Sequence, residues 1–533
     1  VAPSAPPVAR PIEEHQVVEH AGYYRAEFST WGAAPTKFVL LDPQYKVKVD
    51  KHDEPINLIE SADRPPFLTW FEGAGEEARR SGFDVLPRAA WTLAEKTDDK
   101  LRYTLDAGPV HLEKTWTFPA KGYEMRVELA VTNRGDKPLA ARPLLAVDGF
   151  QDPNIQPGGF FSFGQRVNLH SAECDVSKKV RRVARGGGGG CGGGGGGNAW
   201  SEPIHETGEL YWVGIGEQYF LVAAALGADA NGATCHAVGE LSGHISATAV
   251  YPSKTLAPGE RMVTEFVAFA GPKLPSALDA VSVSGRGTET RLTDSLNYTL
   301  EFIATPLQKV LTFLYRIVHN WGVAIILITI LLKLLLLYPT QQSMKSMKEM
   351  AKLKPKIDAL KAKYPDDNAR QQQETMALYK AHGVNPLGSC LPMLLQLPIY
   401  FAFYSMLSNA VELYRSSMFG AGDGSSVWWP PLQDMTASYP PLAVITGALM
   451  YVQQKLSPQT GGDPAQQRML QFMPVIFSVM TLMLPAGLTL YIFTNTLLTM
   501  LHQWWMNRGD EKKPTGGAKS GGGGGKNLKP ARA

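Results

Sequence analysis

The sequence predicts a chain of mixed class, in which an N-terminal all-β domain precedes an all-α region that crosses a membrane several times. Short segments that alternate apolar and polar residues fill about the first half of the 533 residues, and such alternation is typical of half-buried strands. Nearly all long apolar runs lie after Leu300. Charged residues make up 19% of the chain, which is below the roughly 25% of a typical soluble domain.

The composition excludes several other classes of protein. A formal net charge of +3, with no basic patch interleaved with aromatic residues, argues against specific nucleic-acid binding. Four cysteines without CxxC spacing exclude a scaffold built on disulfides, and they also exclude a zinc or dithiol redox site. No nucleotide-binding motif occurs, so no cofactor is expected.

Residues 1–20 are predicted to be a linker, because they begin with an extended stretch rich in proline and alanine. The sequence opens at Val1 without an apolar segment. An anchor helix or signal is therefore expected upstream of it.

Residues 21–297 are predicted to form a β-sandwich, in which turn sequences such as 133–136 separate the strands. The strand candidates are 38–41, 45–49, 102–105, 111–118, 125–131, 219–222 and 262–269. The glycine run 186–197 is expected to be a flexible loop. A phosphate-binding loop is the alternative, but the Lys-Ser/Thr ending and the following helix are missing. The histidines form no HxH or HExxH cluster, so no catalytic site is expected in this domain.

Residues 298–320 carry apolar side chains at helical spacing and are predicted to form an amphipathic helix on a membrane surface. A buried core helix is the alternative. The next region, 321–508, contains stretches that are long enough, or nearly so, to cross about 30 Å of hydrocarbon. These five predicted crossings are 321–339, 387–411, 440–456, 468–485 and 488–506.

The distribution of basic residues predicts the orientation of these crossings. Lysine and arginine are concentrated in 340–382 and in the tail, 509–533, whereas 412–440 has one arginine and three acidic residues. The positive-inside rule therefore places the basic segments and the C-terminus in the cytoplasm and the β domain across the membrane. Apolar residues at helical spacing predict a helical hairpin over 340–382. Its lysines are candidates for contact with anionic lipid or ribosomal RNA, and a solvated face, the usual meaning of such a charge run, is the alternative. These candidates are Lys345, Lys348, Lys352 and Lys356.

Lys333 lies inside the first predicted crossing, where an unpaired charge costs several kcal/mol. One explanation is snorkelling to the headgroups, since Lys333 is six residues from Pro339. The other is a water-filled hollow, which the uncharged polar residues at membrane depth favour. These residues are Thr329, Gln396, Thr481, Thr494, Asn495 and Thr496. They also suit hydrogen bonding between helices, but none of them can neutralise Lys333.

Five stretches of the second half resemble the signature sequences of YidC, the bacterial branch of the Oxa-type membrane protein insertases. They are 376–380, 385–392, 395–400, 472–477 and 484–488. The resemblance covers about 300–508, and the first half is similar to the family's periplasmic domain in size, placement and β character. The family's Pro-Leu-Thr corresponds to Tyr338-Pro339-Thr340 here, with the proline one place late.

The resemblance implies a non-enzymatic insertase of the bacterial inner membrane with a periplasmic β supersandwich. It implies a groove, open to the cytoplasm and to lipid, in which a basic residue attracts the acidic or polar outer part of a nascent membrane protein. Lys333 matches the place of that residue. The implied partners are nascent membrane proteins, lipids, the Sec translocon, and the ribosome with its signal-recognition targeting machinery.

Two other functions are weighed against this one. A secondary transporter or channel would also carry polar groups at membrane depth, but transporters usually show inverted repeats, and five crossings show no such symmetry. An envelope carbohydrate-binding protein would place the function in the β domain, with the second half serving as an anchor.

Overall fold

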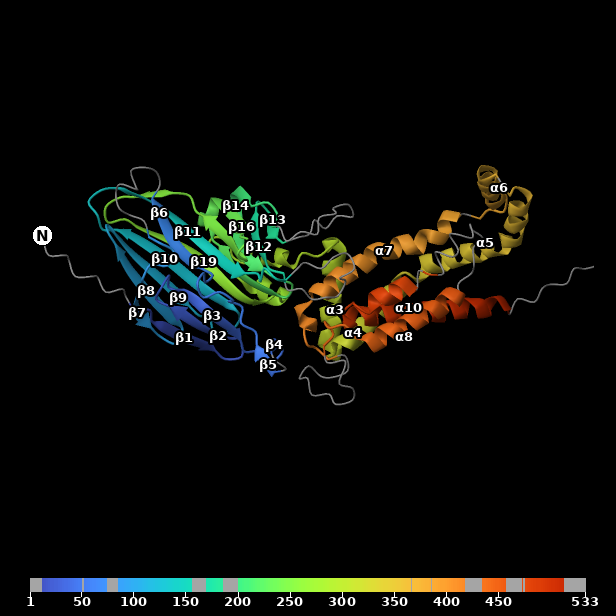
Figure 1. Ribbon diagram of the computed structural model, residues 1–533, viewed down its shortest axis with the longest axis horizontal. Helices are drawn as coiled ribbons and strands as arrows, with labels where there is room; N and C mark the ends of the chain where they lie inside the picture. The colour runs from blue at the N-terminus through green and yellow to red at the C-terminus, as the bar shows by residue number, and fades with distance from the viewer. Residues whose placement is uncertain are drawn as a thin grey trace, which may run out of the picture. The chain divides into compact units, whose positions relative to one another are not determined.

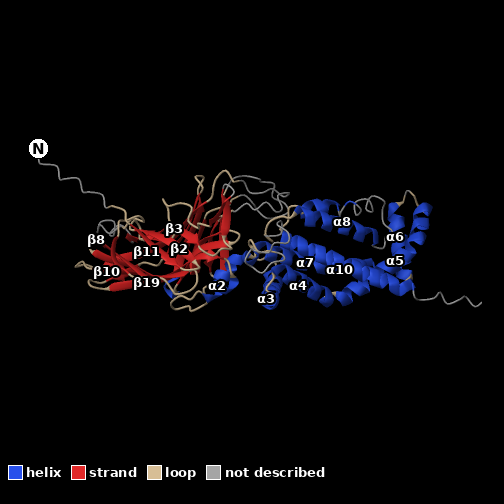
Figure 2. Cartoon of the chain, turned by 90° about the horizontal axis from the view of Figure 1, so that it is seen from below, coloured by secondary structure: helices blue, strands red, loops and turns tan. Residues whose placement is uncertain are grey.

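The computed structural model describes residues 12–49, 52–73, 85–155, 169–185, 200–365, 367–384, 386–417, 434–456, 472 and 475–511. The chain forms two compact units. Unit 1 comprises Val1–Ile328, Met393–Pro441 and Met480–Leu490, and unit 2 comprises Thr329–Pro392, Leu442–Val479 and Tyr491–Ala533. Figure 2 shows that strands occur in one part of the chain and long helices in the other. The predicted order, a β-rich domain followed by a helical region, is confirmed.

The β domain lies in unit 1 and contains antiparallel sheets (Figure 1). Most strands join one 14-stranded sheet, whose main path runs β18-β11-β17-β16-β14-β15-β19-β10-β9-β8-β7, while β1-β2-β3 and β4-β5 form two smaller sheets. The strands are β1 (His15–His20), β2 (Tyr24–Ser29), β3 (Ala34–Leu40), β4 (Lys46–Val49), β5 (His52–Pro55), β6 (Leu68–Gly73), β7 (Thr92–Lys96), β8 (Lys100–Ala107), β9 (Val110–Thr117), β10 (Glu124–Asn133), β11 (Leu139–Phe150), β12 (Ser171–Val176), β13 (Lys179–Ala184), β14 (Ile204–Gly216), β15 (Phe220–Leu226), β16 (Asn231–Gly239), β17 (His244–Val250), β18 (Lys254–Leu256) and β19 (Arg261–Pro272). Each strand candidate from the sequence overlaps one of them.

Strand β9 shows why alternation predicted these elements correctly. Its side chains alternate between buried and partly exposed along the whole strand. Trp116 is fully buried, and its indole N–H donates to the carbonyl oxygen of Ala33 at 2.9 Å. Its ring also meets that of Phe28 edge-on, at 4.9 Å between centroids. Trp116 therefore packs the 14-stranded sheet against the small β1-β2-β3 sheet.

The predicted linker, 1–20, is wrong for its last six residues, because His15–His20 form strand β1 and pair with β2. Only Val18 is buried in β1, so the strand shows no apolar alternation that the sequence could reveal. Residues 1–11 and the glycine run 186–197 lie outside the described residues.

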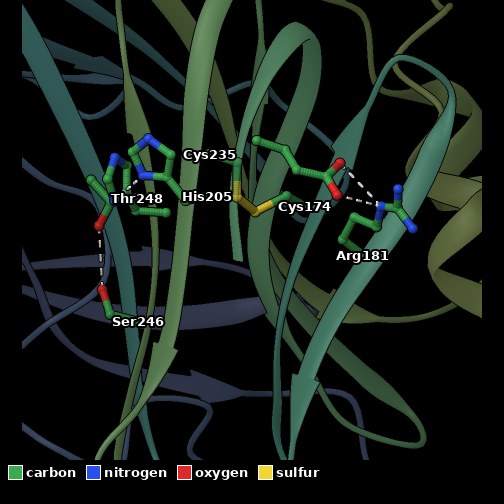
Figure 3. The surroundings of a disulfide bond; sticks show 8 residues. Cys174, Arg181, His205, Cys235, Ser246 and Thr248 are labelled. Carbon is green, nitrogen blue, oxygen red and sulfur yellow. Dashed lines mark hydrogen bonds and ion pairs between the residues drawn. A yellow bond between two sulfur atoms is a disulfide. The ribbon is translucent and has the colours of Figure 1, made fainter. Parts of the chain in front are cut away.

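A disulfide joins Cys174 of β12 to Cys235 of β16, and both residues are fully buried (Figure 3). This pair is not predicted from the sequence. The two cysteines are 61 residues apart, and only the sheet topology brings their strands together. Among the described residues this is the one disulfide, and it lies inside a large apolar core.

The helices are α2 (Pro275–Ala280), α3 (Glu301–Val318), α4 (Trp321–Leu335), α5 (Leu337–Lys363), α6 (Asn368–Ala381), α7 (Pro386–Asn409), α8 (Pro440–Leu456) and α10 (Ala486–Glu511). Residues 475–481 are also helical. Within the described residues, no helix taken alone has both the length and the apolar character of a membrane span. One pair, α4 with α5, meets both criteria together and is bent by 61°. The five crossings therefore stay a prediction.

The helix break at Leu336 explains the displaced proline in the 338–340 motif. Helix α4 ends at Leu335 and α5 begins at Leu337, so Pro339 lies in the first turn of α5. Proline is tolerated there because the first backbone N–H groups of a helix have no intrahelical partner. The first predicted crossing, 321–339, thus covers α4 and the start of α5.

Helices α5 and α6 of unit 2 pack on each other through a small apolar cluster. Met350, Leu353 and Ile357 from α5 meet Tyr379 from α6 and Val384, which follows it. The side chain of Asp367 caps α6 by accepting from the backbone N–H of Arg370 at 2.9 Å. The two helices cover most of 340–382, the range predicted for a hairpin. Helix α10 continues to Glu511, past the predicted start of the tail at 509, and the rest of the tail lies outside the described residues.

Candidate functional site

Lys333 on α4 reaches two neutral oxygens on α10, and both helix segments belong to unit 2. Its ammonium group donates to the hydroxyl oxygen of Thr499 at 2.7 Å and to the side-chain oxygen of Asn495 at 3.2 Å. Asn495 and Thr499 are four residues apart and therefore share one face of α10. The Thr499 hydroxyl donates to the carbonyl oxygen of Asn495 at 2.6 Å, which leaves its lone pairs for Lys333. We call Lys333, Asn495 and Thr499 the Lys333 cluster.

Within the part of the chain that the structure describes, the Lys333 cluster carries a positive charge without a matching negative one. Among the described residues, no Asp or Glu forms an ion pair with Lys333 within 4.0 Å. Neutral oxygens solvate an ammonium group, but they do not cancel its charge. In surroundings of lower dielectric constant than water, such a cation attracts a carboxylate more strongly than a lysine on a wet surface does.

The structure brings only some of the predicted site residues into this cluster. Asn495 joins it directly, and Thr329 lies one turn before Lys333 on α4 with an exposed fraction of 1%. Thr494 and Thr496 are buried on either side of Asn495 in the sequence, and the Thr496 hydroxyl donates to the carbonyl oxygen of Ile492 in the same helix at 2.7 Å. The remaining two residues, Gln396 and Thr481, belong to unit 1.

Thr499 and His502 are two residues of this region that were not predicted from the sequence. Asn495, Thr499 and His502 are spaced by four and three residues, so they line one face of α10, whereas the consecutive run 494–496 turns around the helix. His502 is only 9% exposed, and neither ring nitrogen has a hydrogen-bond partner among the described residues. It is also an ionisable residue inside a predicted crossing, which is the signal that could have revealed it.

The four candidate lysines of the hairpin fall into two pairs. Lys348 donates to the carbonyl oxygen of Met506 at 3.1 Å, near the C-terminal end of α10, where a cation is favourable. Lys356 lies 3.0 Å from a ring nitrogen of His382. Lys345 and Lys352 are exposed on α5. Lys348 and Lys356 therefore have contacts within unit 2, and Lys345 and Lys352 are the better candidates for an outside partner.

A second group of titratable residues surrounds a cavity of about 30 Å³ in the β domain. His170 is central to it, with one ring nitrogen 2.6 Å from the carbonyl oxygen of Phe150 and the other 3.4 Å from the Glu217 carboxylate. Glu60 also lies 3.9 Å away. In the described part of the chain, no group of three or more His, Cys, Asp or Glu residues could hold a metal ion. His170, Glu217 and Glu60, which we call the His170 cluster, therefore interact through their charges within the folded domain.

The His170 cluster predicts a pH dependence of stability. Burial lowers the pKa of His170, but the hydrogen bond and charge of Glu217, together with the charge of Glu60, raise it overall to about 9. Because the pKa of His170 is higher in the folded domain than its value of about 6.5 in the unfolded chain, protonated His170 stabilises the fold. This contribution is complete below about pH 6.5 and is lost as the pH rises through about 9. We expect the stability advantage of the wild type over His170→Gln to fall by roughly 3 kcal/mol across this interval.

Unfolding of both proteins in detergent, followed between pH 6 and pH 10, measures this difference. Taking the difference also removes the opposite contribution of the fully buried Lys114, whose pKa is lowered by burial to about 7 and which is unchanged in the variant. A difference that stays constant over this range would show that the pKa of His170 is not raised.

Comparison with known proteins assigns both halves of the chain. Residues 20–310 match the YidC periplasmic domain family, and residues 313–513 match the family described as 60Kd inner membrane protein. The membrane protein insertase YidC of Syntrophus aciditrophicus is 31% identical over 517 residues, which cover 95% of this chain and 87% of that protein. This chain belongs to the YidC family. A second YidC, from Anaeromyxobacter sp., is 33% identical over 493 residues, which cover 91% of this chain and 83% of that protein.

Solved structures include an active YidC insertase, which matches over 93% of this chain and 95% of that one with 18% identity and a TM-score of 0.37. The assignment to the YidC family rests on the family matches and on the YidC relatives. These relatives are named insertases and not enzymes, which agrees with the prediction for this chain. The YidC family assignment also confirms the β domain as a YidC periplasmic domain and replaces the transporter and carbohydrate-binding alternatives.

Proposed function

We propose that this YidC family member inserts nascent inner-membrane proteins and helps them fold, and that a hydrophilic groove containing Lys333 receives their acidic or polar outer segments. The observation that carries this proposal is the Lys333 cluster, in which two neutral oxygens hold a cation and no carboxylate of the described residues lies within 4.0 Å of it. The absence of a compensating acid among the described residues leaves the charge available to a passing substrate.

The cluster suggests how a substrate is handled. A carboxylate that approaches Lys333 takes over from Thr499 and Asn495 as its partner, and a charge-assisted hydrogen bond is stronger than the neutral ones it replaces. The polar outer segment is thereby held inside the membrane while the adjacent apolar segment moves into lipid. Transfer of apolar surface out of water drives the process forward. No nucleotide is required for any of these steps.

We further propose that the protein spans the bacterial inner membrane five times, with the β domain in the periplasm and the C-terminus in the cytoplasm. The concentration of basic residues in 340–382 and 509–533 supports this orientation. Four of the five predicted crossings each overlap one of the helices α4, α7, α8 and α10, and this overlap supports the number of spans.

The exposed residues Lys345 and Lys352 support contact of the α5–α6 pair with the ribosome or a targeting factor, together with the basic tail. A basic face attracts RNA phosphates and anionic lipid headgroups by the same electrostatic force. We propose that substrates are inserted either by this protein alone or in cooperation with the Sec translocon.

Reconstitution into liposomes tests the proposed function. The purified protein is incorporated into vesicles without other proteins, and a small membrane protein with an acidic outer segment is supplied during synthesis. We expect protease-protected substrate in these vesicles and none in empty vesicles. Absence of protected substrate, with a known insertase active in the same assay, would contradict the proposal.

A further inference from the structure

Helix α3 of unit 1 presents three different faces. Its buried face packs through Ala304, Leu307 and Leu311. A second stripe is apolar and open, with Phe302, Phe313 and Ile317 exposed by 76%, 60% and 60%. The third stripe, between these two, is polar and consists of Thr305, Lys309, Thr312 and Arg316, at the spacing of one helix face. An exposed apolar stripe beside a basic one is typical of a helix in a membrane interface.

The polar stripe of α3 lines a groove of about 460 Å³, which falls in the usual size range of ligand sites, about 300–1,000 Å³. Ser276 and Asp279 of α2 line it as well, and so does Thr293 of the short helix η2 (Leu292–Leu296). The lining also includes Tyr298, whose hydroxyl donates to Gln308 at 2.6 Å, and Gln308 in turn donates to Glu412 at 3.3 Å. This chain of hydrogen bonds fixes part of the groove wall.

The charges in the groove balance. Lys309 and Arg316 are positive, Asp279 and Glu301 are negative, and all four side chains are exposed. In the part of the chain that the structure describes, none of the four forms an ion pair within 4.0 Å. The groove therefore offers both signs of charge, with donors suited to a phosphate and acceptors suited to an ammonium group.

We propose that this groove binds the headgroup of phosphatidylethanolamine, the zwitterionic glycerophospholipid with a primary ammonium group. Lys309 and Arg316 take the phosphate, and Asp279 and Glu301 accept hydrogen bonds from the ammonium group. The acyl chains follow the stripe of Phe302, Phe313 and Ile317. This inference rests on the proposed function in the inner membrane and on the predicted position of residues 298–320 at a membrane surface, and it assigns α3 and the groove the role of a lipid-bound anchor for the β domain.

Two features favour this lipid over its alternatives. An anionic headgroup would satisfy the two cations but would leave both carboxylates facing negative charge. A choline headgroup has no N–H group, so it cannot donate hydrogen bonds to Asp279 and Glu301. Phosphatidylethanolamine satisfies both pairs and leaves the groove neutral.

Native mass spectrometry of the full chain, released from mixed micelles, tests the proposal. The micelles contain equal amounts of phosphatidylethanolamine, phosphatidylglycerol and phosphatidylcholine. We expect the wild type to retain phosphatidylethanolamine about tenfold more than the other two lipids, which corresponds to a binding difference of about 1.4 kcal/mol. The Lys309→Gln/Arg316→Gln variant loses this retention, and Asp279→Asn/Glu301→Gln shifts the preference toward phosphatidylglycerol. The control Lys254→Gln, on β18 with a 54% exposed side chain, behaves as the wild type.

The proposal would be overturned if the three lipids were retained equally, or if the Lys309→Gln/Arg316→Gln variant retained phosphatidylethanolamine as the wild type does. The groove would then be a binding site for a protein segment and not for this lipid. A preference for phosphatidylglycerol in the wild type would also overturn it, in favour of a simple basic surface. The liposome insertion assay measures the proposed insertase function separately, so a failed lipid preference and a failed insertion are distinguishable.

Discussion

Replacement of Lys333 by leucine is expected to reduce insertion of a substrate with an acidic outer segment by about tenfold or more. The attraction between opposite charges about 4 Å apart amounts to roughly 4 kcal/mol at an effective dielectric constant of about 20. If the loss of this attraction raises the barrier to insertion by only about one third of that amount, insertion already slows by about tenfold. Thr499 and Asn495 lose their cation in the variant, and the substrate carboxylate loses its partner.

Lys333→Arg is the matched variant, because it keeps the positive charge while changing the geometry of the donors. We expect it to insert the acidic substrate at a rate close to that of the wild type. A second substrate, with its acidic residues changed to amides, should depend much less on Lys333. The initial rate of protease protection in liposomes measures all of these effects. If the wild type, Lys333→Arg and Lys333→Leu inserted the acidic substrate at equal rates, the charge of Lys333 would not be required for insertion. Lys333 would then be a residue that only snorkels to the headgroups.

Trp116→Ala is expected to lower the free energy of unfolding of the β domain by about 3–5 kcal/mol, as for other large aromatic residues truncated in a core. The side chain is fully buried, and its loss leaves a cavity between β9 and the small β1-β2-β3 sheet. It also removes the donor to the carbonyl of Ala33. Chemical unfolding of the purified protein, followed by tryptophan fluorescence and by circular dichroism, measures the change.

Two further variants separate the causes of this loss. Trp116→Phe keeps an aromatic ring but removes the indole N–H, so we expect a smaller loss than with alanine. Leu241→Ala changes a side chain that is 84% exposed between β16 and β17 and should alter stability by less than about 0.5 kcal/mol. An effect of Trp116→Ala no larger than that of Leu241→Ala would contradict the described core.

The elements that sequence predicted well are those whose own residues carry the pattern. The alternation along β9 and β10 comes from one buried and one open face, and it is visible without knowing the neighbouring strands. The long apolar runs of α4 and α7 are visible in the same way. Lys333 stands out because a charge in an apolar run is costly and therefore rare.

The features that sequence did not reveal depend on partners elsewhere in the chain. Strand β1 is held by its backbone pairing with β2, and its single buried side chain leaves no period. Cys174 and Cys235 meet only after the sheet has formed. Thr499 was missed because threonine is unremarkable in a helix until a lysine from α4 lies 2.7 Å from its hydroxyl.

Coupling with a hydrophobic carbodiimide tests whether a substrate carboxylate meets Lys333 during insertion, because this reagent forms an amide only between a carboxylate and an amine in contact. A substrate with an acidic outer segment is arrested during insertion, treated, and analysed by mass spectrometry. We expect an amide between the substrate carboxylate and the Lys333 amine, and no such product in Lys333→Arg, which still inserts. Coupling only to exposed lysines such as Lys345, with Lys333 unmodified while insertion proceeds, would contradict this expectation.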